Sequence, residues 1–270
     1  MKTLDIFTSF WHFNLPAITI AVLFMLWHWI SNGYRFTKGS KTFFTGIFLL
    51  LLVTVSPLDF LGHHYLFSAH MAEHIVLLLI VPPLLLSGTS PEYIHGLMNK
   101  RWFRKTGKFL FYPVTAWILG VGSMYVWHVP SLFMSMMHSP AVMVLQMVSL
   151  LLIGLIFIWP VFAPVEWMKL SPLECALYLF SACTGCTVLG ILIAFAPTDI
   201  YTSVLMSPDA AVEGLIRNGW GISAHTDQQM AGLIMWVPAC LVYATNILIK
   251  LFKWYSEPDG TMEQPENRIG

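Results

Sequence analysis

Long hydrophobic stretches alternate with short polar connections along the whole chain. A helix needs about 20 residues to cross a hydrocarbon core of roughly 30 Å, and its backbone polar groups must be paired within the segment. Each stretch is therefore expected to be a spanning helix, and the whole an all-α, polytopic transmembrane helical bundle. Seven spans are predicted, at residues 15–31, 43–57, 65–87, 109–127, 140–162, 173–195 and 229–252.

Composition agrees with this pattern. Hydrophobic residues make up 57% of the 270 residues and charged residues only 10%, whereas an ordinary soluble domain has about 25% charged residues. We expect one seven-helix transmembrane domain at residues 1–256, followed by a polar, disordered cytoplasmic tail at 257–270. No small-residue cleavage pattern follows Ile30, so the first span is expected to stay in the mature protein.

Charge and motifs exclude several classes of function. The 14 basic and 14 acidic residues give a net charge of zero, so no nucleic-acid partner is expected. The chain has no Gly-rich phosphate loop, and no nucleophile stands beside a base. We therefore do not expect an enzyme.

Basic residues predict the orientation, because short cytoplasmic loops retain Lys and Arg. Three basic residues lie between the first two spans and five between spans three and four, and only Lys2 and Arg217 of the 14 fall on the opposite side. The N-terminus is then outside and the C-terminus inside. The segment Pro91–Phe111 is interpreted as a topology-setting loop; the alternative is a segment in the headgroup layer.

This orientation places most histidines toward the outside, which indicates a site near the outer membrane face. Eight of the ten are outside or in the outer halves of spans, namely His12, His63, His64, His70, His74, His128, His138 and His225. The outer connection from Ala196 to Gln228 is long enough to fold over the mouth of the bundle.

The third span opens with His70 and His74, which are four residues apart. That spacing puts both imidazoles on one helix face, where two nitrogens can bind one metal ion. Hydrogen bonds to neighbouring helices are the alternative interpretation. Glu73 lies elsewhere on the helix, and its charge needs a partner at that depth.

Other candidate ligands lie at the same level. His128 ends the fourth span, and His225 and Asp227 precede the seventh. Asp227 is equally suited to be a metal ligand or a helix N-cap. The segment from Ser131 to Met143 contributes His138 and four methionines. Thioethers with imidazoles suit monovalent copper, although methionine also fills gaps in apolar cores.

Cys183 and Cys186 form a Cys-x-x-Cys pair within the sixth span. Small neighbouring residues favour a helix-packing role. A redox or metal-binding thiol pair is the alternative, which apolar burial opposes because it raises thiol pKa values.

Four motifs in order resemble the multi-span CtaG-type cytochrome c oxidase assembly factors. They are FSAHMAEHIVLLLIVPPLLLSG after Leu66, WHVP at 127–130, IWPVF at 158–162 and DQQMAGLIMWVP at 227–238. The resemblance implies a seven-span protein of the bacterial inner membrane that matures haem–copper oxidase, with a role in supplying copper. It implies His70, His74, His128 and Asp227 as functional positions.

One position departs from the family pattern. The family's fifth span commonly carries Glu-His where this chain has Gln146 and Met147. At 1.5 Å per residue, Met147 and His74 are expected at similar depths. The substitution replaces an imidazole by a thioether, which suits cuprous copper.

Together these features lead to the hypothesis of an assembly factor that binds monovalent copper near the outer face and delivers it to cytochrome c oxidase. The expected partners are oxidase subunits or a copper-donating chaperone, with the lipid bilayer. Two alternatives remain, a copper permease and a haem- or quinone-linked membrane redox protein. The expected ligands are His70, His74 and His128 with Met147 or Asp227, and the expected capture residues are His225, His138 and Met134–Met137.

Overall fold

The structure is a computed structural model that describes residues 3–197, 200–201, 205 and 208–256. Helices are the only regular elements within those residues, which confirms the predicted all-α class. The predicted polar tail, residues 257–270, lies outside the described residues.

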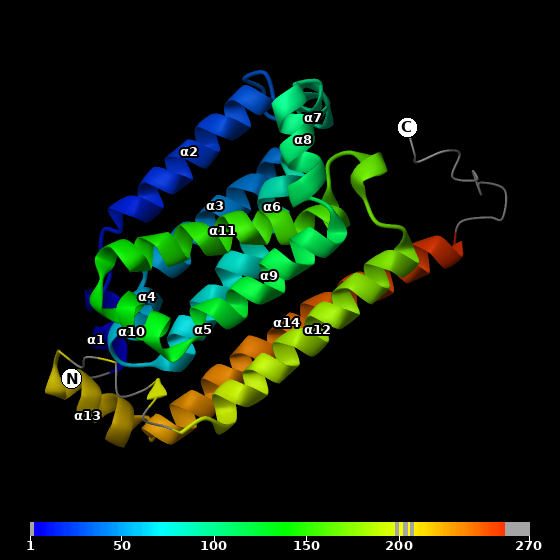
Figure 1. Cartoon of the computed structure of the whole chain (residues 1–270). Coiled ribbons are helices and arrows are strands. Elements are labelled where there is room, and N and C mark those ends of the chain that lie inside the picture. The colour runs from blue at the N-terminus through cyan, green and yellow to red at the C-terminus, as the bar shows by residue number, and fades with distance from the viewer. Residues whose placement is uncertain (1–2, 198–199, 202–204, 206–207, 257–270) are drawn as a thin grey trace.

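Each of the seven predicted segments is helical (Figure 1). The corresponding elements are α2 (Leu15–Ser31), α3 (Ser40–Val55), the run α5 (Phe67–Ile75), η1 (Val76–Ile80) and α6 (Val81–Ser87), then α9 (Pro113–Trp127), α11 (Pro140–Phe162), α12 (Pro172–Phe195) and α14 (Ala224–Ser256). Shorter elements connect them: α1 (Thr3–Ser9), α4 (Pro57–His64), α7 (Pro91–Met98), α8 (Arg101–Leu110), α10 (Pro130–His138), η2 (Glu166–Met168), α13 (Ala210–Gly214) and η5 (Leu215–Gly219).

Length and hydropathy support four to six membrane spans within the described residues, fewer than the seven predicted. The α5–α6 run, α11, α12 and α14 are each long and apolar enough to cross a membrane. Two more spans result if α3 with α4, bent by 46°, and α8 with α9, bent by 62°, each count as one. Helix α2 is apolar but has only 17 residues. The chain is thus a multi-pass membrane protein, and a seventh span at α2 stays a prediction.

Proline and a capping side chain define where several helices begin. Proline fits the first turn because its missing N–H has no intrahelical partner there. In α2, α4 and α12 it is combined with the capping residues Asn14, Ser56 and Ser171. Ser171 and Glu174 form a complete capping box. These starts keep the polar connections at the ends of the bundle.

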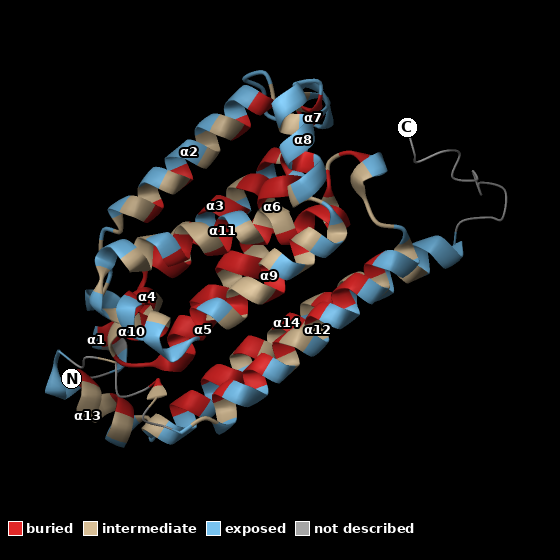
Figure 2. Ribbon diagram, in the orientation of Figure 1, coloured by how far each residue is buried: buried red, intermediate tan, exposed pale blue. Residues whose placement is uncertain are grey.

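The α5–η1–α6 run is the central span (Figure 2). In an apolar stretch of 18 residues within this run, 72% is buried inside the protein. The corresponding share is 39% for α11 and α12 and 22% for α14. Pro82 lacks the N–H that would bond to the carbonyl of Leu78 in a regular helix, and the turn before it is a π-helix. Gly154 of α11 packs on this wide turn, since a Cβ there would lie 2.7 Å from the Leu78 oxygen.

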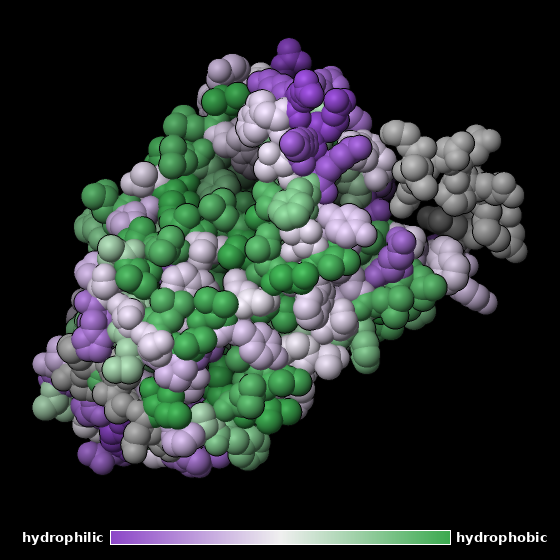
Figure 3. Space-filling view, in the orientation of Figure 1, coloured by the Kyte–Doolittle hydropathy of each residue, from purple (hydrophilic) through white to green (hydrophobic). Residues whose placement is uncertain are grey.

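The two ends of the bundle are polar and the middle is hydrophobic, as Figure 3 shows. We call one end the basic end, formed by α7, α8, Lys169 and the last turns of α14. The opposite end, formed by α1, α4, α10 and the first turns of α5 and α14, is called the histidine end.

Helices α12 and α14 lie side by side along most of their length. Gly190 and Gly232 permit the close approach, because a Cβ on Gly190 would lie 2.7 Å from the Gly232 oxygen. A disulfide joins Cys183 to Cys240 across the pair, whereas Cys186 is a buried free thiol. The two cysteines of the Cys-x-x-Cys motif therefore have different roles in the fold.

Enlarging Gly190 is expected to destabilise the α12–α14 pair. In Gly190→Val the new side chain overlaps the Gly232 backbone and Cβ of Trp236, which costs about 1–3 kcal/mol. Thermal unfolding in detergent measures the loss. The matched control is Gly122→Val, because nothing lies within 4 Å of a Cβ at Gly122; equal loss in both variants would contradict the packing role.

Candidate metal centre

His70 and His74 lie one turn apart on α5, with ring centroids 4.2 Å apart. Both are almost fully buried, with 1% and 2% of their surface exposed. Neither ring nitrogen of either residue has a hydrogen-bond partner among the described residues. An unpaired buried polar atom costs about 1–3 kcal/mol. The hydrogen bonds considered as the alternative are not made at normal length among the described residues, and each neutral ring keeps one nitrogen lone pair for a ligand, two in all.

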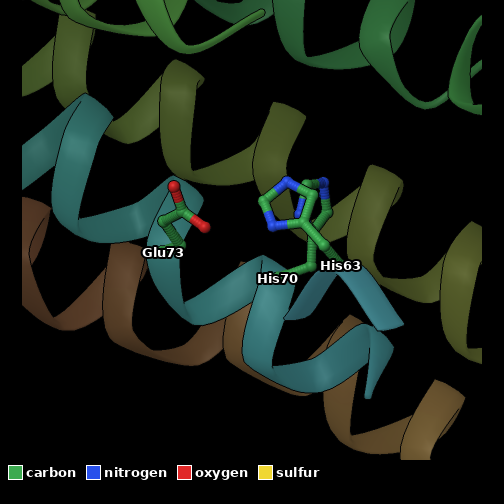
Figure 4. A group of neighbouring side chains, drawn as sticks. All are labelled: His63, His70 and Glu73. Carbon is green, nitrogen blue, oxygen red and sulfur yellow. The ribbon is translucent and has the colours of Figure 1, made fainter. Parts of the chain in front are cut away.

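His63 and Glu73 extend this pair to a group that could hold a metal ion. Ligand atoms of His63, His70 and Glu73 all lie within 4.8 Å of one another. Figure 4 shows the three side chains projecting to the same side, His63 from the end of α4 and the others from α5. Glu73 is buried and its Oε2 has no hydrogen-bond partner in the described structure. The sequence analysis did not propose His63 or Glu73 as metal ligands, although Glu73 is three residues after His70 and such residues are neighbours on a helix.

Hydrogen bonds to backbone carbonyls orient two of the imidazoles. Nδ1 of His63 donates to the Asp59 carbonyl at 2.9 Å, and Nδ1 of His128 donates to the Met124 carbonyl at 2.6 Å. A carbonyl only accepts, so each Nδ1 carries the hydrogen, and Nε2 of the neutral ring has a free lone pair. Metal-binding histidines are commonly held in this way by a second group.

Sulfur atoms lie beside the imidazoles. Nε2 of His128 is 3.1 Å from Sδ of Met71, and the His128 ring centroid is 5.8 Å from that of His74. Met147 and His74 line the same cavity, so the two share a layer as expected from their depths. His74 thus has the His128 imidazole of the α9 C-cap on one side and shares a cavity with the Met147 thioether of α11.

This cavity has a volume of about 330 Å³ and connects the imidazoles to the surface. Its lining includes His63, Glu73 and His74 from the inner part and His12 from the mouth, where 38% of the His12 side chain is exposed. The amide nitrogen of Gln146, another lining residue, is buried without a hydrogen-bond partner in the described chain. A small ion could thus reach the imidazoles from the histidine end.

Asp227 caps a helix, and the helix is α5 rather than its own. Its carboxylate accepts the backbone N–H groups of Phe67 at 2.7 Å and Ser68 at 3.0 Å, and the Ser68 hydroxyl. The residue at the cap position of α5, Leu66, provides no such bond. Asp227 is fully buried, and its two oxygens face the helix start. It therefore positions the imidazoles through the backbone of α5.

The predicted capture residues lie at the surface of the histidine end. His138 and His225 are exposed, and Nδ1 of His138 donates to the Met134 carbonyl at 2.7 Å. The methionine segment is helix α10, in which Met134 is 47% exposed but Met136 is fully buried. His138 and Met134 thus remain available as surface groups, while Met136 belongs to the core.

One described residue of the long outer connection, Tyr201, packs against the ends of the helices that carry the imidazoles. Tyr201 stacks on Phe67 with 5.0 Å between centroids, and its hydroxyl donates to the His128 carbonyl at 2.8 Å. Both contacts involve residues at the ends of the helices that carry the imidazoles, so water has less access to them from that side.

An ion pair at the cavity mouth is expected to give the histidine end a pH-dependent stability. Nε2 of His12 lies 3.0 Å from Asp59, and this hydrogen bond raises the pKa of His12 above its ordinary 6.5, against a smaller opposing effect of burial. A raised pKa contributes stability at pH below 6.5, and this is lost as the pH rises through the raised value. His12→Asn should therefore lower the thermal unfolding midpoint at about pH 5.5 and have little effect at about pH 9.5.

The control for this titration is His95→Asn, since His95 is exposed on α7 at the basic end. It should leave the midpoint unchanged at both pH values. An effect of His12→Asn that is equal at both pH values would mean that the charge of the ring is unimportant.

The geometry can be compared with known proteins. The family model for the cytochrome c oxidase caa3 assembly factor (Caa3_CtaG) matches residues 22–257. A protein of Mycobacterium leprae (strain TN), described as uncharacterized, is 26% identical over an aligned length of 213 residues, and the match covers 70% of this chain and 30% of that relative. The chain thus spans less than a third of the length of that relative. No solved structure gives a significant match. The resemblance stated from four motifs is confirmed, and the chain belongs to the cytochrome c oxidase caa3 assembly factor family.

Proposed function

We propose that this assembly factor binds copper at the histidine end and delivers it to cytochrome c oxidase. One observation carries the proposal: the nitrogens of His70 and His74 are buried without hydrogen-bond partners in the described chain, beside two further imidazoles, those of His63 and His128, whose Nδ1 atoms are held by backbone carbonyls. The chain belongs to a family of cytochrome c oxidase assembly factors, and haem–copper oxidases need a supply of copper.

The donor set favours copper over harder ions. His70, His74 and His128 provide nitrogen, and Met71 and Met147 provide thioether sulfur. Thioether with imidazole suits cuprous copper, whereas Mg²⁺ and Ca²⁺ prefer oxygen ligands. Glu73 and His63 add a carboxylate and an imidazole next to His70, which suits the entry of a divalent ion. The site as a whole would take copper in either state and retain the monovalent ion best.

The direction of delivery follows from charge. The basic end carries Arg101, Arg104, Lys105 and Lys108 on α8 and Lys253 on α14. Retention of basic residues on the cytoplasmic side puts the histidine end and the N-terminus outside, in a seven-span arrangement in the inner membrane of a bacterium. The partners are then oxidase subunits or a copper-donating chaperone that approaches from outside, and the surface residues His138, His225 and Met134 make the first contacts with the ion.

Delivery on one side fits better than transport across the membrane. Beyond His74 the interior contains Leu78, Val121 and Phe157 around a void of only about 10 Å³, which is about the volume of one water-sized probe. A permease needs ligands that continue inward, and the soft groups that line this void are one thiol, Cys186, and one thioether, Met124. Binding and release through the same outer cavity require no catalysis.

Copper binding by the purified protein tests the proposal. We expect about one copper ion per chain to remain after gel filtration under reducing conditions, and X-ray absorption to detect both nitrogen and sulfur ligands. Zinc, offered at the same concentration, should be retained less, because zinc proteins seldom use thioethers. Protein that retains no copper, or copper with oxygen ligands only, would contradict the proposal.

A further inference from the structure

A groove at the basic end, far from the imidazoles, has the character of a lipid-binding site. It lies between the ends of α8 and α9 on one side and η2 and α12 on the other, with a volume of about 880 Å³. Most of its lining is aromatic or aliphatic and includes Phe111, Tyr112, Trp117, Trp167, Leu177 and Phe180. Several of these side chains are highly exposed, among them Leu177 at 64% and Phe180 at 67%.

Positive charge is confined to one end of this groove. Lys108 and Lys169 line it where α8 ends and α12 is about to begin, and Lys169 also pairs with Glu166. The one carboxylate among the lining residues, Glu174, accepts the Ser171 N–H at 2.9 Å as part of the capping box. Two ammonium groups thus face any bound molecule at the level where the helices leave the membrane.

The groove then becomes apolar with depth. Ser181 lies seven residues beyond Glu174 on the same helix, which corresponds to roughly 10 Å along the axis. Over that distance the lining comes from α9 and α12, including Trp117 and Phe180. The charge at one end and the apolar length below it match a headgroup and an acyl chain.

Trp117 also lines the groove. Tryptophan characteristically lies at the level where a membrane meets water, so this ring agrees with a headgroup at the charged end and an acyl chain below it. Its indole nitrogen is buried and is not accessible from the groove. The neighbouring Tyr178 hydroxyl donates to the Phe157 carbonyl at 2.7 Å, so the charged contacts with a bound molecule come from the lysines.

We propose that this groove binds one anionic phospholipid of the cytoplasmic leaflet. Lys108 and Lys169 contact the headgroup phosphate, and an acyl chain lies along Trp117, Phe180 and Leu177. Anionic lipids are attracted by basic residues at the cytoplasmic surface, and the further basic residues of α8 add to that attraction. The lipid bridges the end of α8 and the start of α12, which both line the groove.

Native mass spectrometry tests this proposal. The full-length protein is released from nanodiscs that contain equal amounts of dioleoyl-phosphatidylglycerol and dioleoyl-phosphatidylcholine, and the retained lipids are counted. Wild type should retain one phosphatidylglycerol preferentially. Lys108→Gln with Lys169→Gln should reduce that retention roughly tenfold or more, because each basic group near the surface contributes to anionic-lipid binding.

The matched control removes the same charge outside the groove. Arg101→Gln with Arg104→Gln lies on α8, and neither residue lines the groove; retention should fall roughly threefold or less. Equal losses in the two double variants, or equal retention of both lipids by wild type, would overturn the proposal.

A charge-conserving variant controls for misfolding of the glutamine variant. Lys108→Arg with Lys169→Arg should retain phosphatidylglycerol at nearly the wild-type level, and a loss as large as in the glutamine variant would overturn the headgroup contact. Copper content should be unchanged throughout, since the groove and the imidazoles share no lining residue. The lipid proposal is therefore tested independently of the copper proposal.

Discussion

Replacing His70 and His74 together by alanine is expected to abolish copper binding by the purified protein. The double substitution removes four buried imidazole nitrogens that have no other partner in the described chain. It leaves His63 and His128 on separate helical elements, with the space of two side chains between them. In cells whose oxidase depends on this protein, the same variant should lose active oxidase. Metal analysis of the protein and the oxidase activity of membranes measure the two effects.

A histidine outside the site controls for the general effect of such substitutions. His95→Ala, on exposed α7 at the basic end, should retain both copper and oxidase activity. The double variant removes unpaired buried polar atoms, so it should fold at least as stably as wild type, and its thermal unfolding shows whether misfolding explains a loss of copper. Normal copper content together with normal oxidase would refute the proposed site.

Replacing Asp227 by alanine is expected to have the largest effect of any substitution that touches no proposed ligand. The carboxylate accepts two backbone N–H groups and one hydroxyl at the start of α5. Its loss leaves these donors buried without partners, at a cost of about 2–3 kcal/mol. Copper affinity should also fall roughly tenfold or more, as is usual when a group that orients metal ligands is removed. Thermal unfolding and copper competition assays give the two values.

Asp209 provides a matched carboxylate for comparison. It caps α13 by accepting the Ala211 N–H at 2.7 Å, but at an exposed position away from the imidazoles. Asp209→Ala should reduce stability only slightly and leave copper affinity unchanged. If Asp227→Ala lowered affinity without lowering stability, Asp227 would be a ligand rather than a cap.

The sequence was sufficient to locate the helices but not to count the spans. All seven hydrophobic stretches are helical, because a run of apolar residues in lipid has few other solutions. Bends such as the one between Val55 and Pro57 depend on packing, and hydropathy does not report them. The π-turn before Pro82 is similar: proline indicates a break in the hydrogen-bond pattern, but only the fit against Gly154 shows how it is accommodated.

The candidate site was predicted in part. The spacing of His70 and His74 predicted that both lie on one helix face. Their estimated depths in the membrane predicted that Met147 lies near His74, and the two residues line the same cavity. His63 was missed because the chain turns between α4 and α5, so its distance to His70 in space does not follow from helix periodicity. The partner of Cys183 was likewise out of reach, since Cys240 is 57 residues away and nothing local indicates the pairing.

The bond from Asp227 to the start of α5 also joins residues that are synthesised far apart in time. Phe67 and Asp227 are separated by 160 positions, and a nascent chain emerges from its N-terminus at about 5–20 residues per second. The first amides of α5 consequently stay uncapped until the last helix has been inserted. An unfinished or truncated chain would present its imidazoles on an unanchored helix, so the proposed copper site would form only after the last helix has been synthesised.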